Sequence, residues 1–408
     1  MGRIDDKTPS NSPSMGRIER MVAELCPEGV PMVTLGEVCL SIKTGKLNAN
    51  AKEENGQYPF YTCDAEPYRI NTYAFDCEAI LVTGNGSQVG HINYYKGKFN
   101  AYQRTYVLSK FDESINIFYA LHYFKAYLKD YILLNSKKGS IPYITLPMLL
   151  EFQISLPPLP VQEAIVEILE KFDRLSAELQ AELQARKQQY EYYRNQLLTR
   201  FAPEQPVTEY SLGELFVFKN GLNASKEQFG HGKPIVNYVN VYKKCSIVSE
   251  DLQGRVDLDK TSIDRYRVQR GDVFFTRTSE TQDEIGIASV LLENIEDCVF
   301  SGFVLRARPI TNFLLPEYCK YCFSTNNVRR QIIRSSTLTT RALTNGTSLS
   351  KVKILVPSLE EQSRIVAILD KFEALVNDLS QGLPAEIAAV QEQYEYYRNK
   401  LLTFKTKE

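Results

Sequence analysis

The stretch QYEYYRNQLLT at residues 189–199 recurs as QYEYYRNKLLT at residues 393–403, with ten of eleven positions identical. Each copy ends a long pattern of apolar residues at helical spacing. The patterns begin 200 residues apart (Gln162 and Gln362) and end 204 apart (Gln189 and Gln393), so the second copy carries four extra residues. A repeat of this length indicates a duplicated architecture. Two unrelated coiled-coil segments of similar composition would not be expected to share Tyr-Glu-Tyr-Tyr-Arg-Asn.

The two patterns, Leu159–Phe201 and Leu359–Phe404, are predicted to be long helices. Apolar side chains recur at alternating threes and fours, which is typical of a coiled-coil seam. A helix of about 40 residues reaches roughly 60 Å and cannot bury such a seam alone. We therefore predict that the two helices pair with each other. Gly382 and Pro384 should break or kink the second helix locally.

Each long helix follows a segment of mixed character, and the two segments share a plan. Leu35-Gly36-Glu37 in the first corresponds to Leu212-Gly213-Glu214 in the second, and strand-like runs between Gly and Asn turns come next. The runs are 58–62, 79–82 and 105–108, then 271–275 and 303–306, and a predicted helix follows at 115–134 and at 317–334. The chain is thus predicted to alternate two α+β globules with two helices.

These patterns divide the chain into six predicted segments. They are a disordered leader or tag at 1–14, an N-terminal helix at 15–30, a first globule at 31–157, a first long helix at 158–201, a second globule at 202–357 and a second long helix at 358–404. The leader is suggested because Met15-Gly16-Arg17-Ile18 repeats Met1-Gly2-Arg3-Ile4.

Composition narrows the classes of partner. The chain has 48 basic and 49 acidic residues, a formal net charge of −1, so any nucleic-acid role needs local basic patches. No apolar run reaches the 18 or so residues of a membrane span, so no membrane partner is expected. The eight cysteines are scattered and no signal peptide leads the chain, so we expect reduced thiols in a cytoplasmic protein. Cys319 and Cys322 have no second matching pair, which favours buried thiols on a helix face over a zinc site.

The paired Leu-Gly-Glu openings, the paired Pro–Leu–Gln/Glu helix starts and both Gln-Tyr-Glu-Tyr-Tyr-Arg-Asn ends resemble the specificity subunit of type I restriction–modification systems. The resemblance covers about residues 15–404. It implies two target-recognition domains and two helices that form an antiparallel coiled coil, in a circular, pseudo-two-fold arrangement. The N-terminus should then lie near the end of the second helix. The first helix departs from the family form, because residues 177–184 read as a doubled Ala-Glu-Leu-Gln unit.

The resemblance also implies a function. Such a subunit is not itself catalytic; each recognition domain binds one half of a split, asymmetric site in double-stranded DNA, and the helices set the spacer. It recruits two modification subunits, which bind S-adenosylmethionine and methylate adenine, and restriction subunits, which use ATP and Mg to cut DNA. This chain itself would hold no cofactor and no metal.

Two other classes of function are enzymes and scaffold proteins. Adenine methyltransferases resemble one another in an Asn/Asp-Pro-Pro-aromatic motif, and many ATPases have a P-loop. The sequence contains neither motif, which does not favour an enzyme of either kind. A coiled-coil scaffold that carries two modules for ligands other than DNA stays open, since the near-neutral charge permits it.

Candidate DNA contacts lie in polar or basic segments next to the predicted strands. Residues 83–88, Thr-Gly-Asn-Gly-Ser-Gln, allow close backbone approach to phosphate, and Asn and Gln suit adenine edges, although an ordinary tight turn would look the same. Arg277 follows the equivalent strand and suits guanine. The first globule contributes Lys43, Lys46, Asn85, Ser87, Gln88, Gln103, Arg104, Lys137, Lys138 and Ser140. The second contributes Lys219, Arg277, Thr278, Ser279, Thr339, Arg341 and Asn345.

The repeated helix ends supply the candidate contacts with partner subunits. These are Tyr190, Tyr193, Arg194, Tyr394, Tyr397 and Arg398. The doubled unit at residues 177–184 is either ordinary helix-forming sequence or part of a ruler. Four residues lengthen a helix by about 6 Å and rotate its end by roughly 40°.

Overall fold

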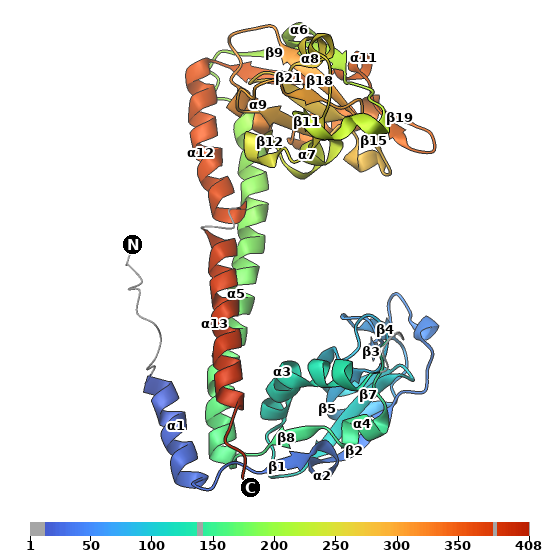
Figure 1. Cartoon of the computed structure of the whole chain (residues 1–408), viewed down its shortest axis with the longest axis vertical. Helices are drawn as coiled ribbons and strands as arrows, with labels where there is room; N and C mark the ends of the chain where they lie inside the picture. Colours follow the sequence, from blue (N-terminus) through green and yellow to red (C-terminus); the bar gives the residue numbers. More distant parts are fainter. Residues whose placement is uncertain (1–12, 137–141, 378–381, 408) are drawn as a thin grey trace. The chain divides into compact units, whose positions relative to one another are not determined.

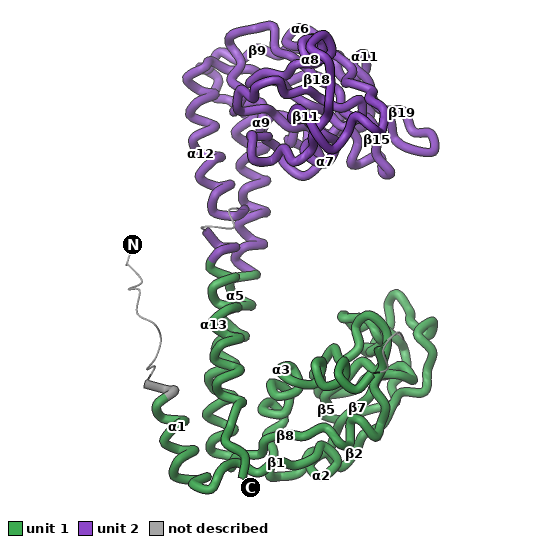
Figure 2. Tube along the Cα trace, in the orientation of Figure 1, with its two compact units in different colours: residues 1–180, 386–408 green, residues 181–385 purple. Residues whose placement is uncertain are grey.

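The computed structural model describes residues 13–136, 142–377 and 382–407, with side chains from residue 16 onward. Its elements are labelled in Figure 1. The chain forms two compact units: unit 1 includes residues up to 180 and from 386 onward, and unit 2 includes residues 181–385 (Figure 2). The boundary falls inside helix α5 (Leu159–Thr199), so each unit contains one sheet domain and part of the helical pair.

Unit 1 is built on a six-stranded sheet in the order β2-β7-β5-β6-β3-β4. Neighbouring strands are antiparallel except β3 and β6, which are parallel. The strands are β2 (Cys39–Thr44), β3 (Tyr58–Tyr61), β4 (Tyr68–Ile70), β5 (Phe75–Thr83), β6 (Ile92–Ala101) and β7 (Thr105–Phe111). Helix α3 (Ile117–Asn135) buries Tyr119, Phe124 and Leu128 with Ile80 and Leu108 of the sheet, which forms the core.

Shorter elements complete unit 1. They are α1 (Pro13–Leu25), α2 (Leu35–Val38), α4 (Leu146–Leu150) and the antiparallel pair β1 (Met32–Thr34) and β8 (Gln153–Ser155).

Unit 2 has a five-stranded sheet in the order β10-β18-β14-β16-β12 and two three-stranded sheets, β13-β11-β17 and β15-β20-β19. The strands of the large sheet are β10 (Phe216–Asn220), β12 (Ser246–Ile247), β14 (Val273–Thr276), β16 (Ala288–Leu291) and β18 (Val304–Pro309). The small sheets contain β11 (Phe229–Val236), β13 (Arg255–Val256), β17 (Val299–Phe300), β15 (Thr278–Ser279), β19 (Thr337–Leu338) and β20 (Ala342–Leu343). Its helices are α6 (Leu212–Leu215), α7 (Tyr238–Lys243), α8 (Lys260–Tyr266), α9 (Pro316–Cys322), α10 (Asn326–Ser335) and α11 (Gly346–Leu349), and β9 (Val207–Ser211) pairs with β21 (Lys353–Pro357).

The shared plan predicted for the two globules is confirmed in the order of the main strands, although two strands of unit 2, β16 and β17, take the place of the single strand β6. β10, β18, β14 and β16 are antiparallel neighbours in the same order as β2, β7, β5 and β6. β11 runs parallel to β17 as β3 runs parallel to β6. Both Leu-Gly-Glu openings form a single helical turn, which begins with a capping box of Thr34 with Glu37 and of Ser211 with Glu214.

In each unit, a glycine follows the edge strand of the large sheet, at a point where two segments of backbone lie very close together. A Cβ on Gly45 would lie 1.7 Å from the carbonyl oxygen of Ala101, and one on Gly221 would lie 2.1 Å from that of Ser301. Isolated parallel bridges follow, Leu47 with Tyr102 and Leu222 with Ser301. Only glycine allows backbone to approach backbone this closely, so both units need it at the same point.

The predicted helix at 317–334 is wrong in one respect, because it is two helices. α9 ends at Cys322, and α10 begins after Thr325, whose hydroxyl donates to the Cys322 carbonyl (2.9 Å) and accepts from the Val328 amide (3.4 Å). A threonine that caps a new helix competes with continuation of the old one. Cys319 and Cys322 are buried thiols on α9, as predicted.

The second long helix is broken, as Gly382 and Pro384 predicted. α12 (Leu359–Asn377) and α13 (Leu383–Leu402) are separate helices. Gly382 has a φ of 78°, which favours glycine, and Pro384 lies in the first turn of α13, where it costs no hydrogen bond.

The helices pair antiparallel within each unit, through the repeated motif. In unit 1, the Phe172 ring of α5 lies 6.2 Å from Tyr394 and 5.5 Å from Tyr397 of α13. In unit 2, the Phe372 ring of α12 lies 5.7 Å from Tyr193 of α5. The end of each long helix therefore packs on the start of the other, as a pseudo-two-fold arrangement requires.

A buried glutamine attaches each sheet domain to its helix. The Gln162 side chain accepts from the Asn116 amide (2.8 Å) and donates to the carbonyls of Ser114 (2.8 Å) and Pro157 (2.7 Å). Gln362 makes the same three bonds, at 2.9 Å each, with Leu315, Phe313 and Pro357. Both side chains are fully buried.

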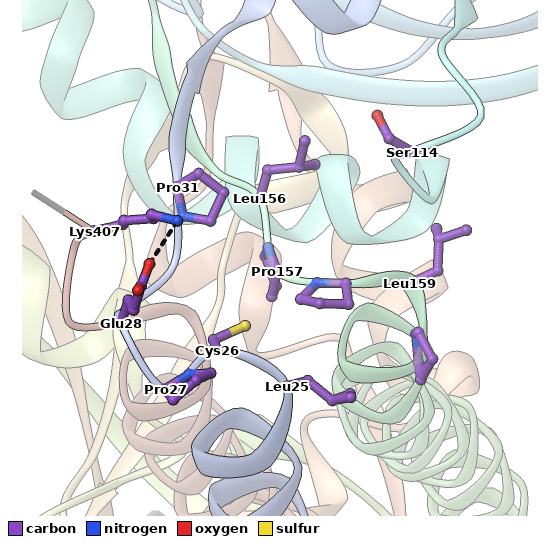
Figure 3. Close-up of a pocket in the computed structure, with 13 residues that line it drawn as sticks. Leu25, Cys26, Pro27, Glu28, Pro31, Ser114, Leu156, Pro157, Leu159 and Lys407 are labelled. Carbon is purple, nitrogen blue, oxygen red and sulfur yellow. Dashed lines mark ion pairs between the residues drawn. The ribbon is translucent and has the colours of Figure 1, made fainter.

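The predicted closure of the chain is confirmed within unit 1. The Val30 amide donates to the Lys405 carbonyl (2.8 Å), and the Lys407 amide donates to the Val30 carbonyl (3.0 Å). A hollow of about 810 Å³ lies beside this junction, lined mainly by prolines and leucines, with an ion pair between Glu28 and Lys407 (2.8 Å) at one side (Figure 3).

Candidate nucleic-acid interface

Three loops meet at one end of the unit 1 sheet: residues 45–48, 84–88 and 102–104. The Gln103 amide donates to the Leu47 carbonyl (3.0 Å), and the Gly84 amide donates to the Arg104 carbonyl (2.8 Å). A Cβ on Gly84 would lie 2.3 Å from that oxygen, so glycine is needed for the contact. Predicted residues far apart in sequence are therefore neighbours.

Most of the predicted side chains in these loops are exposed. They are Lys46, Ser87, Gln88, Gln103 and Arg104, and Lys43 is exposed on the preceding strand β2. Asn85 is half-buried; its side-chain oxygen accepts from the Cys63 thiol (2.9 Å), and its backbone pairs with Tyr143. The cluster thus presents two cations and several amide groups, which suit phosphate and base edges respectively.

Lys137, Lys138 and Ser140 lie outside the described residues. The chain on their C-terminal side contacts the same loop cluster, because the Ile144 amide donates to the Gly84 carbonyl (2.9 Å).

In unit 2, Arg277 occupies the position of Gly84. Its amide donates to the Phe303 carbonyl (3.4 Å), and its carbonyl accepts from the Thr344 amide (3.0 Å). Its guanidinium Nη1 donates to the Gly302 carbonyl (2.9 Å), which fixes the half-buried side chain against the turn at 301–304. The equivalence of the two strand ends, predicted from sequence, is therefore confirmed at the backbone.

The remaining unit 2 candidates lie on or near the β19–β20 hairpin. Thr278 and Ser279 form β15, which pairs with β20. Thr339 and Arg341 are exposed, and Arg341 pairs with Glu280 (2.9 Å). Asn345 caps α11, since its side chain accepts from the Ser348 amide (2.9 Å). Ser279 is buried, so of this group Thr278, Thr339 and Arg341 are the best placed to contact a ligand.

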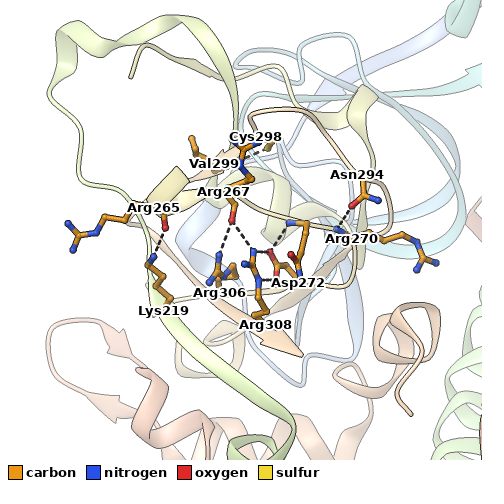
Figure 4. Close-up of polar contacts among 11 residues, drawn as sticks. Lys219, Arg265, Arg267, Arg270, Asp272, Asn294, Cys298, Val299, Arg306 and Arg308 are labelled. Carbon is orange, nitrogen blue, oxygen red and sulfur yellow. Dashed lines mark hydrogen bonds and ion pairs between the residues drawn. The ribbon is translucent and has the colours of Figure 1, made fainter. Parts of the chain in front are cut away.

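Lys219 belongs to a basic cluster that joins α8 to the sheet (Figure 4). Its amine donates to the Arg265 carbonyl, and burial together with Arg306 lowers its pKa. Arg306 and Arg308 both donate to the Arg267 carbonyl at 2.9 Å. Cations that bind carbonyls at a helix C-terminus stabilise it, so this cluster has a structural use that the sequence did not reveal.

The cluster also contains a charge pair. Arg308 binds the fully buried Asp272 carboxylate with two bonds, of 2.8 and 2.7 Å. Two parallel bonds fix the guanidinium plane, so Arg308 is not free to turn toward a ligand.

Sequence reasoning missed two exposed apolar residues beside Arg277. Phe303 is 69% exposed and Leu343 is 39% exposed. Phe303 follows Gly302 in the turn that corresponds to Gln103-Arg104, and that alignment is the signal that would have revealed it.

The repeated motif divides into an inner and an outer face. Tyr394 is buried and Tyr190 is partly buried; Arg398 and Arg194 stack on these rings at 5.6 and 5.5 Å. Tyr193 and Tyr397 pack on the phenylalanines of the partner helix. Tyr192 and Tyr396, which the motif did not single out, are 59% and 50% exposed.

Throughout the described ranges, no helix has the length and apolar character needed to cross a bilayer.

The comparisons with known proteins agree with this arrangement. The family model for the type I restriction modification DNA specificity domain matches residues 27–186 and 204–389. The specificity subunit of the Escherichia coli type I restriction enzyme EcoR124I/EcoR124II is 34% identical over 258 residues, which cover 60% of this chain and 60% of that protein. The chain therefore aligns with less than two thirds of that relative.

Another curated protein, a putative type I specificity subunit from Mycoplasma pneumoniae, is 30% identical over 351 residues, 82% of this chain and 96% of that protein. A chain from a structural study of the type I R-M system has a TM-score of 0.63 at 15% identity, over 92% of this chain and 97% of that one, which shows the shared fold. With two matched domains on one helical frame, this chain belongs to the family of type I restriction–modification DNA specificity proteins.

Proposed function

We propose that the chain is the DNA-binding specificity subunit of a type I restriction–modification complex, and that each unit reads one half of a bipartite, asymmetric site. The observation that carries this proposal is a shared backbone with different tips. Gly84 and Gln103-Arg104 in unit 1 stand where Arg277 and Gly302-Phe303 stand in unit 2. Side chains at loop tips select bases, so different tips on one plan imply different half-sites.

The chain reads DNA and leaves chemistry to its partners. Modification subunits would supply S-adenosylmethionine and the transferred methyl group, and restriction subunits would supply ATP hydrolysis and Mg. Relatives named as specificity subunits support this division.

Two equivalent surfaces support the recruitment of two modification subunits. Tyr192 and Tyr396 hold the same position in the repeated motif, and both point away from the helix pair that their neighbours stabilise. Exposed tyrosines are enriched at protein interfaces. One copy of the partner would bind at each tyrosine.

The helices set the spacer in this proposal. α5 is continuous over 41 residues and includes the doubled unit at 177–184. Removal of Ala181–Gln184 shortens the helix by about 6 Å. At about 3.4 Å per base pair, we expect the gap between half-sites to shrink by one or two base pairs.

The proposal is tested by co-expressing the chain with modification subunits in a host without methylation and sequencing the methylated motifs. A split, asymmetric motif is expected, with a shorter gap for the deletion variant. A motif without a gap, or no methylation together with no sequence-specific retention in a gel shift, would instead favour a scaffold for other ligands. An unchanged gap in the deletion variant would remove only the role of helix length.

A further inference from the structure

Apolar side chains gather where unit 2 should meet DNA. Phe303 is at the tip of a tight turn, closed by a bond from the Val304 amide to the Ser301 carbonyl (3.1 Å). It is 69% exposed, and Leu343 of the β19–β20 hairpin is 39% exposed. Exposed apolar side chains that lie close to the candidate DNA contacts are typical of an interaction surface.

Arg277 connects the turn to the hairpin. Its amide donates to the Phe303 carbonyl and its carbonyl accepts from the Thr344 amide, so the turn that carries Phe303 and the residue that follows Leu343 both contact Arg277. β14 and β18 pair Thr276 with Val304, and the same antiparallel register places Arg277 opposite Phe303.

The hairpin adds a row of methyl groups. Thr278 pairs with Leu343, and Leu343 pairs with Thr337, so these three residues lie directly opposite one another across three strands. Leu343 and Thr337 are exposed and Thr278 is half-buried. The row therefore carries methyl groups to the surface next to Arg277.

We propose that unit 2 recognises thymine through this surface, by apolar contact between Phe303 and the Thr278–Leu343–Thr337 row and the C5-methyl groups of its half-site. Thymine is the base that presents a methyl group in the major groove, and threonine methyls and phenylalanine are suited to contact it. A two-stranded ribbon fits that groove. This inference rests on the proposed function and assigns it a base preference.

Unit 1 provides the internal contrast. The equivalent turn carries exposed Gln103 and Arg104, and the loop beside it carries Ser87 and Gln88. These side chains read bases by hydrogen bonds, which do not depend on the thymine methyl group.

The experiment uses the chain assembled with its modification subunits and duplexes that carry the methylated motif. Thymines are replaced one at a time by deoxyuridine, which keeps base pairing and groove hydrogen bonds but lacks the methyl group. Loss of one buried methyl contact should weaken binding about four-fold. We expect this loss at one or more thymines of the half-site read by unit 2, and little change in the other half-site.

Protein variants assign the effect. Phe303→Ser and Leu343→Ser should bind thymine and deoxyuridine duplexes equally. Ile310→Ser is the matched control, because Ile310 is 58% exposed just beyond the opposite end of β18. It should retain the preference for thymine.

The outcomes separate the two proposals. Equal binding of thymine and deoxyuridine at every position by the unaltered chain would overturn the methyl contact while leaving the specificity function intact. The same is true if both serine variants keep the full preference. If the assembled complex binds no split motif in duplexes that contain thymine at every position, the proposed function is instead rejected.

Discussion

The two units use one frame for two surfaces. Each has the same buried glutamine, the same glycine closure and the same aromatic packing between helices. They differ at the loop tips, where unit 1 presents Gln103 and Arg104 and unit 2 presents Phe303. The comparison teaches that side chains that hold the frame lie on the long helices, whereas side chains that differ lie at strand ends.

The frame is tested most strongly at its glutamines. Gln162→Leu and Gln362→Leu each remove three hydrogen bonds and leave buried backbone groups without partners. We expect each to cost about 3 kcal/mol or more in the free energy of unfolding of its own unit, measured by urea denaturation. Gln184→Leu, on an exposed position of α5, should cost less than about 0.5 kcal/mol. If one glutamine variant were as stable as this control, the two frames would not be equivalent.

His122 distinguishes the units by pH. It is buried in unit 1, 3.4 Å from the Tyr394 hydroxyl, where unit 2 has Tyr321 bonded to Asp370 and Glu373. Burial lowers the pKa of His122 from 6.5 to about 4, against the opposing effect of Asp173; Lys125 and Arg398 lower it further.

The unfolded chain protonates His122 more readily than the folded chain does. The free energy of unfolding is therefore at its full value above pH 6.5 and decreases as the pH falls toward 4. Up to about 3 kcal/mol should disappear over this range. His122→Gln should flatten that part of the stability profile of unit 1, and an unchanged profile would assign the acid sensitivity to other groups.

The outer tyrosines should have the smallest effect on stability. Tyr192→Ser and Tyr396→Ser are exposed changes and should alter the free energy of unfolding by less than about 0.5 kcal/mol. Each should nevertheless reduce the number of bound modification subunits from two to one, as measured by native mass spectrometry. Phe172→Ala, in the half-buried aromatic contact with Tyr394 and Tyr397, should instead destabilise unit 1 by about 2 kcal/mol. Two subunits bound to the double tyrosine variant would exclude this surface.

Much of this frame was predictable because repeats and apolar periodicity can be recognised in the sequence without knowledge of tertiary contacts. The 200-residue offset identified Gln162 with Gln362, and the Gly-Leu-Pro sequence predicted the helix break. The break between α9 and α10 was missed because one threonine overrode a helical pattern. The structural use of Lys219 depends on a carbonyl 46 residues away, which no local pattern contains.

Because unit 1 contains residues from both ends of the chain, the two units cannot be completed in the order in which they are synthesised. All of unit 2 comes from the continuous stretch 181–385, whereas unit 1 waits for residues from 386 onward. Before residues 386 onward are synthesised, the first turns of α5 expose an apolar seam because α13 is still missing. At that stage all residues of unit 2 are already present. The domain made first is therefore the last to be finished, and its bare seam must be protected from other nascent chains until α13 arrives.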